Sequence, residues 1–153
     1  MKRLCCVIPV LMVSGVLLCS CAGSPADNLG LVNSELAACP TSPNCVVSNS
    51  RDPGHKIAPL RLNPSDSDIW PAVLKVVAQL PRTTIVTATG DYLHAECRSA
   101  LFGFVDDLEL HYRPAEGMIA VRSGARLGYF DFGVNRRRVE TLRSALIHLG
   151  LVH

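Results

Sequence analysis

The chain has 153 residues, of which 48% are hydrophobic and 18% are charged, with 15 basic and 13 acidic side chains. This near-neutral balance argues against nucleic acid as a partner, because binding to a phosphate backbone requires a clear excess of Lys and Arg. The length fits a single domain with one sizeable core.

The first twenty residues have the features of a bacterial secretory signal peptide. A basic start precedes an apolar run over residues 7–18, which is too short to cross a hydrocarbon core of ~30 Å as a helix. The run ends in a lipobox at residues 18–21, in which Cys21 is the residue that receives the lipid. The alternative is ordinary cleavage without a lipid, after Ala22 or Ala26.

Such a signal predicts both the compartment and the charge of the mature protein. We expect the protein in the bacterial cell envelope, anchored in a membrane through lipid on Cys21. Ala22, where an Asp would favour the inner membrane, points to the outer membrane, facing the periplasm. Removal of residues 1–20 takes away two basic residues, so 13 basic and 13 acidic side chains remain.

The mature chain divides by composition into a tether and a domain. Residues 21–38 are expected to form the lipid anchor and tether, and residues 39–153 a single α+β domain. In an oxidising compartment Cys39 and Cys45 are expected to form a disulfide across a short turn, which is worth roughly 2 kcal/mol. The alternative is a metal-binding pair, but no second pair lies at zinc-finger spacing. Cys97 is expected to be a buried, inert thiol.

The next segments predict helices and strands in turn. Residues 40–64 contain five prolines and are expected to be extended and to wrap the domain. Helical spacing predicts a first helix that includes residues 70–77 and ends at Pro81, with N-cap side chains in residues 66–68. Alternation then predicts four strands joined by short turns, over residues 84–89, 92–100, 104–113 and 118–123.

The order of these elements predicts the architecture. An aromatic, Gly-rich loop over residues 124–133 leads to a last helix, which Asn135 is expected to cap. The resulting order α-β-β-β-β-α predicts a two-layer α+β sandwich, with a four-stranded antiparallel meander and two flanking helices on one face. The other face is expected to be open or partly roofed by the disulfide-pinned N-terminal segment.

Alternation also gathers charged side chains on one face of this sheet. The strand 92–100 contributes His94, Glu96 and Arg98, and the next strand contributes Asp107, Glu109, His111 and Arg113. A hairpin that turns around residues 102–103 would place in opposition His94 and His111, Glu96 and Glu109, and Arg98 and Asp107.

Like charges directly opposite each other destabilise a sheet unless something lies between them. Arg122 on the neighbouring strand is one candidate. A metal ion is another, with His94, Glu96, Glu109 and His111 as weak candidate ligands. The third alternative is a solvated face with cross-strand ion pairs, and paired carboxylates could also work as acid and base.

A second charged cluster lies at the start of the last helix. Arg136, Arg137 and Arg138 follow Asn135 directly, although positive charge at a helix N-terminus opposes the helix dipole. The arginines could be paired, and the candidate partners are Asp106, Asp131 and Glu140, which lies one turn from Arg136. They could instead bind an anion such as phosphate or a carboxylate.

Several of these segments resemble motifs of the bacterial family known as domain of unknown function 1499. They are residues 39–48, 92–96, 104–109, 121–126 and 131–140. The resemblance covers most of the mature chain, from about Cys39 to Leu146. One small departure is Gly124, where the family pattern often has Ser, and His111 is not part of the pattern, which weakens the two-histidine metal hypothesis.

The resemblance implies a fold and a set of polar signature positions, because no activity is established for the family. Those positions coincide with the two charged clusters: Glu96, Asp106, Asp107, Glu109, Arg122, Arg126, Asp131, Asn135, Arg136 and Glu140. The sequence contains no G-x-S-x-G, H-E-x-x-H or Gly-rich phosphate motif. No cofactor is expected.

Two functions follow as hypotheses. The first is a non-enzymatic envelope lipoprotein that binds an anionic envelope component or a protein partner through its Arg, Asp and Glu side chains. The alternative is an envelope hydrolase or transferase in which Glu96, Asp107 and Glu109 act as acid, base or metal ligands.

Overall fold

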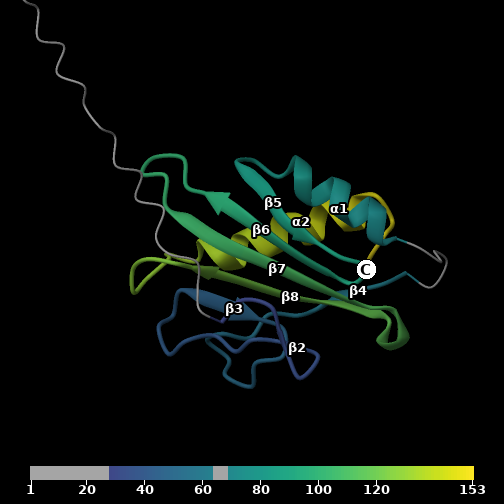
Figure 1. Ribbon diagram of the computed structural model, residues 1–153, viewed down its shortest axis with the longest axis horizontal. Coiled ribbons are helices and arrows are strands. Elements are labelled where there is room, and N and C mark those ends of the chain that lie inside the picture. Colours follow the sequence, from purple (N-terminus) through teal and green to yellow (C-terminus); the bar gives the residue numbers. More distant parts are fainter. Residues whose placement is uncertain (1–27, 64–68) are drawn as a thin grey trace, which may run out of the picture.

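A computed structural model describes residues 28–63 and 69–153 of the chain. The fold is α+β, with a mostly antiparallel sheet and, in the described part, two helices (Figure 1). The central strands are β5 (Thr83–Ala88), β6 (Tyr92–Arg98), β7 (Val105–Arg113) and β8 (Met118–Ala125). They pair antiparallel in chain order, close to the predicted bounds, because alternating residues set their two faces.

The sheet extends beyond the four predicted strands. Two short strands, β3 (Cys45–Val47) and β4 (Leu60–Arg61), both pair antiparallel with β8. The prediction missed them because they lie in the proline-containing segment and are too short to show alternation. A 3₁₀ turn, η1 (Pro114–Glu116), joins β7 and β8.

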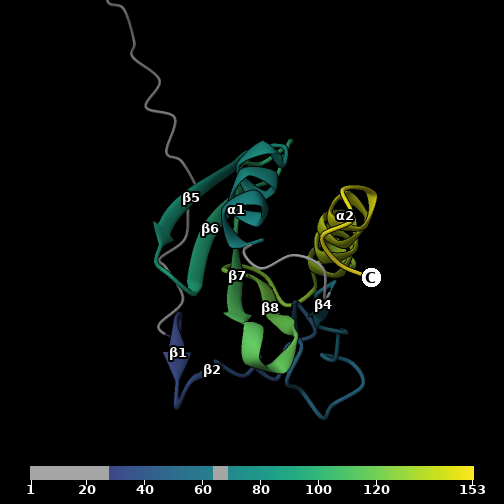
Figure 2. The same cartoon turned by 90° about the vertical axis from the view of Figure 1, so that its right-hand side faces the viewer.

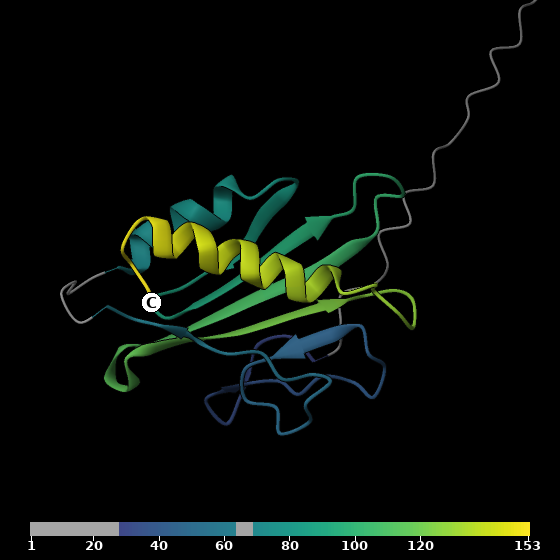
Figure 3. The same cartoon turned by 180° about the vertical axis from the view of Figure 1, so that it is seen from behind.

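Both helices lie on one face of the sheet, as predicted (Figure 3). Helix α1 (Trp70–Gln79) ends just before Pro81, and the expected capping residues 66–68 lie outside the described residues. Helix α2 (Val134–His148) follows the aromatic loop. The apolar stripes of both helices meet the sheet in one core, which contains Val73, Val77, Leu108, Leu110, Val139, Leu142 and Leu146.

The start of α2 differs from the prediction. Gly133, with a positive φ of 74°, is the N-cap, and Asn135 lies inside the first turn. The carboxylate of Asp131 accepts hydrogen bonds from the backbone N–H groups of Gly133 (2.9 Å) and Asn135 (2.8 Å). Asp131 therefore caps α2 in place of Asn135. Its carboxylate accepts hydrogen bonds from the free N–H groups, and its negative charge interacts favourably with the positive end of the helix dipole.

The other face of the sheet is roofed by the N-terminal segment, which was one of the two alternatives expected from the sequence. Strands β1 (Leu31–Val32) and β2 (Glu35–Leu36) form a two-stranded sheet on the side away from α1 (Figure 2). Leu36 packs with Val47 of β3 and Ala120 of β8 in a small apolar cluster. Residues 28–38, which the sequence places in the tether, thus pack on the domain because Leu36 buries its side chain there.

The predicted cysteine chemistry is present. Cys39 and Cys45 form a disulfide with an S–S distance of 2.05 Å, which ties the start of β3 to the roof. Cys97 is a buried free thiol, and burial raises its pKa, so it remains protonated and inert.

Candidate functional site

The register of β6 on β7 decides which charged side chains lie opposite each other on the roofed face of the sheet. His94 lies opposite Glu109 and Glu96 lies opposite Asp107, whereas Arg98 lies opposite Val105. The predicted register, which placed His94 opposite His111 and Glu96 opposite Glu109, is therefore wrong by two residues. The hairpin loop is longer than the tight turn that was assumed, and an even shift changes the partners but leaves every side chain on its predicted face.

Glu109 is the centre of this face and is fully buried. Its carboxylate accepts three hydrogen bonds, from Arg122 Nη1 (2.7 Å), the Tyr92 hydroxyl (2.7 Å) and the Gly30 backbone N–H (2.7 Å). Arg122 lies directly opposite Glu109 in β8, so the register creates the ion pair, as the sequence suggested for Arg122. Burial, and then the neighbouring carboxylate, raise the pKa of Tyr92, which keeps the hydroxyl as a donor.

Asp107 forms a second centre on the same face. Its Oδ1 lies 2.7 Å from His94 Nε2 and accepts a 2.7 Å hydrogen bond from Arg126 Nη2, and its Oδ2 accepts one of 3.0 Å from Arg126 Nε. Arg126 also donates to Glu96 at 2.8 Å. Burial alone raises the pKa of Asp107, but the hydrogen bonds from His94 and Arg126 outweigh it and hold the pKa below its ordinary value.

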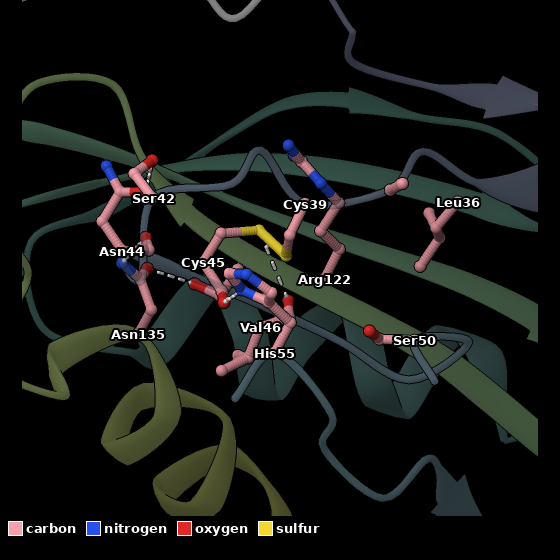
Figure 4. Close-up of a disulfide and its surroundings, with 12 residues drawn as sticks. Leu36, Cys39, Ser42, Asn44, Cys45, Val46, Ser50, His55, Arg122 and Asn135 are labelled. Carbon is pink, nitrogen blue, oxygen red and sulfur yellow. Dashed lines mark hydrogen bonds between the residues drawn. A yellow bond between two sulfur atoms is a disulfide. The ribbon is translucent and has the colours of Figure 1, made fainter. Parts of the chain in front are cut away.

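A cavity of about 320 Å³ opens beside these two centres. It lies between the end of β8 and the segment around the disulfide, and the side chains of Arg122, Arg126, Asn28, Ser42 and Asn44 are among those that line it. Figure 4 shows Arg122 beside the Cys39–Cys45 disulfide. A Cβ on Gly124 would lie 3.3 Å from Cys45 Sγ and 3.9 Å from Arg122 Nη2, so a larger side chain there would narrow this space.

Arg122 is only partly satisfied by protein groups. Its side chain is 4% exposed, and its Nε–H has no acceptor among the described residues. Its Nη2 makes one long bond of 3.3 Å, to Asn28 Oδ1. A buried donor without an acceptor is expensive, so such a group calls for a specific explanation.

The arginines at the start of α2 do not converge on one site. Arg138 pairs with Asp106 at 2.6 Å, Arg136 donates to the Gly54 carbonyl at 3.2 Å, and Arg137 donates to the Phe132 carbonyl at 2.8 Å. Burial raises the pKa of Asp106 despite Arg138.

One of the pairings expected for these arginines is wrong. The partner of Glu140 is Arg143, one turn further along α2, at 2.9 Å. Arg136 instead reaches the turn at Gly54. Of the three candidate acids, Asp106 pairs with Arg138 and Asp131 caps the loop, so the arginines have mainly local structural partners.

The candidate metal ligands are not gathered either. His94 is engaged with Asp107, whereas His111 lies opposite Tyr92 and 3.8 Å from Asp91. Within residues 28–63 and 69–153, no three His, Cys, Asp or Glu side chains are grouped to hold an ion. Burial lowers the pKa of His111. No helix in these ranges combines the length and apolar character needed to cross a bilayer.

A further feature was not predicted from sequence. The loop over residues 99–104 and the loop over residues 126–134 expose apolar side chains at one end of the sheet, and we call this surface the apolar tip. Its exposed members are Leu101, Phe102, Phe104, Leu127, Tyr129, Phe130, Phe132 and Val134. The aromatic, Gly-rich composition of the second loop was the available signal, but composition does not reveal whether rings point outward.

A comparison with known protein families identifies the family of this chain. The family model described as "Protein of unknown function (DUF1499)" matches residues 35–146. The chain belongs to this family. No curated protein and no solved structure matches the chain.

The polar positions that the resemblance implied fall into two groups in this structure. One group lies on the roofed face of the sheet: Glu96, Asp107, Glu109, Arg122 and Arg126. The other lies around the start of α2: Asp106, Asp131, Asn135 and Arg136. Glu140 lies apart from both, exposed on α2, and Cys21 lies outside the described residues.

The two groups touch through Ser123 and Asn135. The Ser123 hydroxyl donates to Asn135 Oδ1 at 2.7 Å and accepts from Arg138 Nη1 at 3.0 Å. Asn135 Nδ2 in turn donates to the backbone carbonyl of Asn44, which lines the cavity, at 3.0 Å (Figure 4). Asn135 therefore links the start of α2 to the lining of the cavity.

Proposed function

We propose that this DUF1499 protein is a lipid-anchored, non-enzymatic binding protein of the bacterial cell envelope. Its ligand is an anionic envelope component or a partner protein that presents a carboxylate or phosphate group to Arg122. The sequence supports the anchor through the signal and lipobox around Cys21. In this proposal, the meander β5–β8 and its two helices form a two-layer sandwich, and the segment around the disulfide closes the binding cavity.

The observation that carries this proposal is the free edge of the Arg122 guanidinium. Nε and Nη2 share the edge of the group on which a carboxylate or phosphate docks with two parallel hydrogen bonds. Nε has no acceptor among the described residues, and Nη2 has only the 3.3 Å bond to Asn28. An incoming oxyanion would satisfy Nε and displace or share the weak bond of Nη2.

The surrounding charges are arranged so that this edge can receive an anion. Glu109 is held by three donors, and Asp107 is matched by Arg126 and His94, so both carboxylates are already compensated. Ser42 and Asn44, which line the cavity with neutral side chains, are bonded to each other and add no charge that would repel an anion. Arginine in a partly enclosed cavity is the usual choice for bidentate recognition of such groups.

The hydrolase or transferase hypothesis receives less support from the geometry. General acid or base catalysis needs a carboxyl group that exchanges a proton near the working pH. Glu109 is fully buried and its oxygens already accept hydrogen bonds from three donors, and the pKa of Asp107 lies below its ordinary value. Glu96 is tied to Arg126 and Arg98.

The binding proposal is tested by thermal unfolding of the protein with inorganic phosphate or acetate. A ligand that binds the folded state raises the melting temperature with concentration. Arg122→Lys keeps a positive charge beside Glu109 but removes the planar fork, so the concentration-dependent rise should disappear. Arg143→Lys, on α2 and outside the cavity lining, is the matched control and should keep it. An equal rise in both variants would contradict the proposal.

The lipid anchor is tested separately. The intact mass of the protein purified from membranes should correspond to a chain that begins at an acylated Cys21, and Cys21→Ser should release the protein from the membrane fraction. An unmodified mature chain would contradict the anchor but would leave the anion site intact.

A further inference from the structure

The apolar tip is the largest exposed apolar feature of the described chain. Phe132 is 87% exposed, Leu101 83% and Phe102 67%. The two loops line one largely apolar cavity of about 470 Å³, so their side chains form a continuous surface. A contiguous apolar patch of this kind on a folded protein usually marks a protein or membrane contact. Both loops lie at the same end of the sheet (Figures 1 and 3).

The backbone holds these rings away from the core. Phe132 has a φ of 52°, a left-handed conformation that is unfavourable for a residue with a side chain. Hydrogen bonds on both sides fix it there, because Asp131 accepts from the Gly133 N–H and Arg137 donates to the Phe132 carbonyl. The loop therefore keeps the exposed Phe132 in an unfavourable backbone conformation. Backbone strain of this kind is found at functional surfaces.

Positive charge lies beside the apolar surface. A neighbouring cleft of about 460 Å³ shares Ser99, Ala100 and Val134 with the apolar cavity, and its lining includes Arg82, Arg98, Arg137 and Arg138. Arg82, Arg98 and Arg137 are exposed.

The acidic groups near the tip are occupied by other contacts. Asp106 pairs with Arg138, and Asp131 caps the loop before α2. Glu96 pairs with both Arg98 and Arg126. The tip thus combines apolar rings with exposed guanidinium groups, which is the composition of surfaces that bind anionic membranes.

We propose that the apolar tip inserts into the surface of an anionic phospholipid bilayer, with Arg82, Arg98 and Arg137 at the level of the lipid headgroups. The inference rests on the proposed anchor at Cys21. Asn28 follows Cys21 by seven positions, and seven extended residues span at most ~25 Å. Asn28 lines the anion cavity, which shares Ala125 and Gly128 with the apolar cavity, so the anchor joins the domain close to the tip.

Insertion would also give the anion site an orientation. The cavity beside Arg122 would open near the membrane surface, where anionic envelope groups are concentrated. The ligand proposed above would then be met at the bilayer and not in free solution.

The inference is tested by fluorescence of the acylated, full-length mature protein in vesicles of phosphatidylethanolamine and phosphatidylglycerol with brominated acyl chains. Bromine quenches tryptophan that enters the bilayer, and the common signal of Trp70 is subtracted using the unsubstituted protein. Phe132→Trp places the probe at the tip. Leu149→Trp is the matched control, because Leu149 is also exposed (58%) but lies after the far end of α2, a helix about 22 Å long.

We expect quenching of Phe132→Trp to exceed that of Leu149→Trp by about threefold or more, since an interfacial side chain enters ~5–10 Å into the headgroup and acyl boundary. Adding Leu101→Ser and Phe102→Ser to the Phe132→Trp protein should reduce the quenching to the control level. Replacing phosphatidylglycerol with phosphatidylcholine should also reduce it. Equal quenching at the two positions, as expected for a tip that binds a soluble protein, would overturn the inference.

The two proposals fail in different ways. If phosphate still stabilises the protein and Cys21 is acylated but the tip is not quenched, the tip inference is wrong and the proposed function stands. If Cys21 carries no lipid, the anchor is wrong, and quenching with added vesicles still decides whether the tip enters a bilayer.

Discussion

The two faces of strand β7 are both buried, but by opposite chemistry. On the helix side Leu108 and Leu110 are fully buried in the apolar core, whereas on the roofed side Asp107 and Glu109 are almost completely buried among ion pairs. Burying an apolar side chain is favourable by about 1.5–3 kcal/mol. A buried ion pair gains little over apolar residues of the same volume, because desolvation offsets the attraction.

The comparison suggests why the roofed face is charged. Apolar residues at positions 109 and 122 would stabilise the fold as well as this ion pair does. The buried Arg122 guanidinium keeps one N–H without an acceptor among the described residues, and this is the observation behind the proposed ligand. The helix face therefore holds the domain together, and the roofed face holds the proposed site.

The largest expected effect comes from breaking the central pair. Arg122→Met should lower the free energy of unfolding by about 3–5 kcal/mol, because Glu109 would remain buried without its cation. Urea denaturation measures this. The double variant Glu109→Leu, Arg122→Met should recover most of the loss. If the double variant is as unstable as the single one, the roofed face is required for stability and the comparison fails.

A smaller effect is expected from opening the roof. Cys39→Ser, or reduction of the disulfide, should cost about 2 kcal/mol, because a short loop is freed in the unfolded chain. The same denaturation experiment measures it, with and without reductant. Reductant should leave the Cys39→Ser variant unchanged, and a further loss there would show that reduction acts elsewhere.

Neighbouring carboxyls on the two faces should respond to pH in opposite directions. The pKa of Asp107 is lowered in the folded state. Its contribution to the free energy of unfolding is therefore present at pH values above its ordinary pKa of 3.8 and is lost as the pH falls through the folded pKa. The pKa of Asp106 is raised in the folded state. Its contribution to the free energy of unfolding is therefore present at pH values below 3.8 and is lost as the pH rises through the folded pKa. NMR titration of the two carboxyl carbons should therefore give a higher pKa for Asp106, and the reverse order would contradict the account.

The smallest effect is expected at the apolar tip. Phe132→Ser should change the free energy of unfolding by no more than about 0.5 kcal/mol, because the ring is exposed and contributes little to the core. Thermal or urea unfolding measures this, with Leu108→Ala, expected to cost about 2–5 kcal/mol, as the buried counterpart. A loss above 2 kcal/mol for Phe132→Ser would mean that the tip is structural.

The parts predicted correctly from sequence depend on local periodicity. Alternation placed Leu108 and Glu109 on opposite faces, and helical spacing found the stripes of both helices, because each pattern is set by the geometry of one element. The register of β6 on β7 depends on the length of the loop over residues 99–104, which has no periodic signal. That is why Glu109 faces His94 and not Glu96.

The site itself was found in outline and not in detail. Charge placement offered Arg122 as one candidate to lie between Glu96 and Glu109, but no pattern indicates that the backbone of Gly30 would close over the Glu109 carboxylate. Asn135 was a reasonable cap by residue type, whereas Asp131 reached the free N–H groups because Gly133 adopts a positive φ. Contacts between segments distant in sequence decided each of these outcomes.

Binding of an anion to the Arg122 side chain can be observed by NMR at its Nε–H. The protein is titrated with inorganic phosphate while the arginine Nε–H resonances are followed, with Arg143 as the internal control because its Nε already donates to Glu140. If Arg122 binds phosphate, we expect a saturable shift of the Arg122 resonance and a constant Arg143 resonance. An Arg122 resonance that does not move, or that moves only in parallel with Arg143, would contradict it.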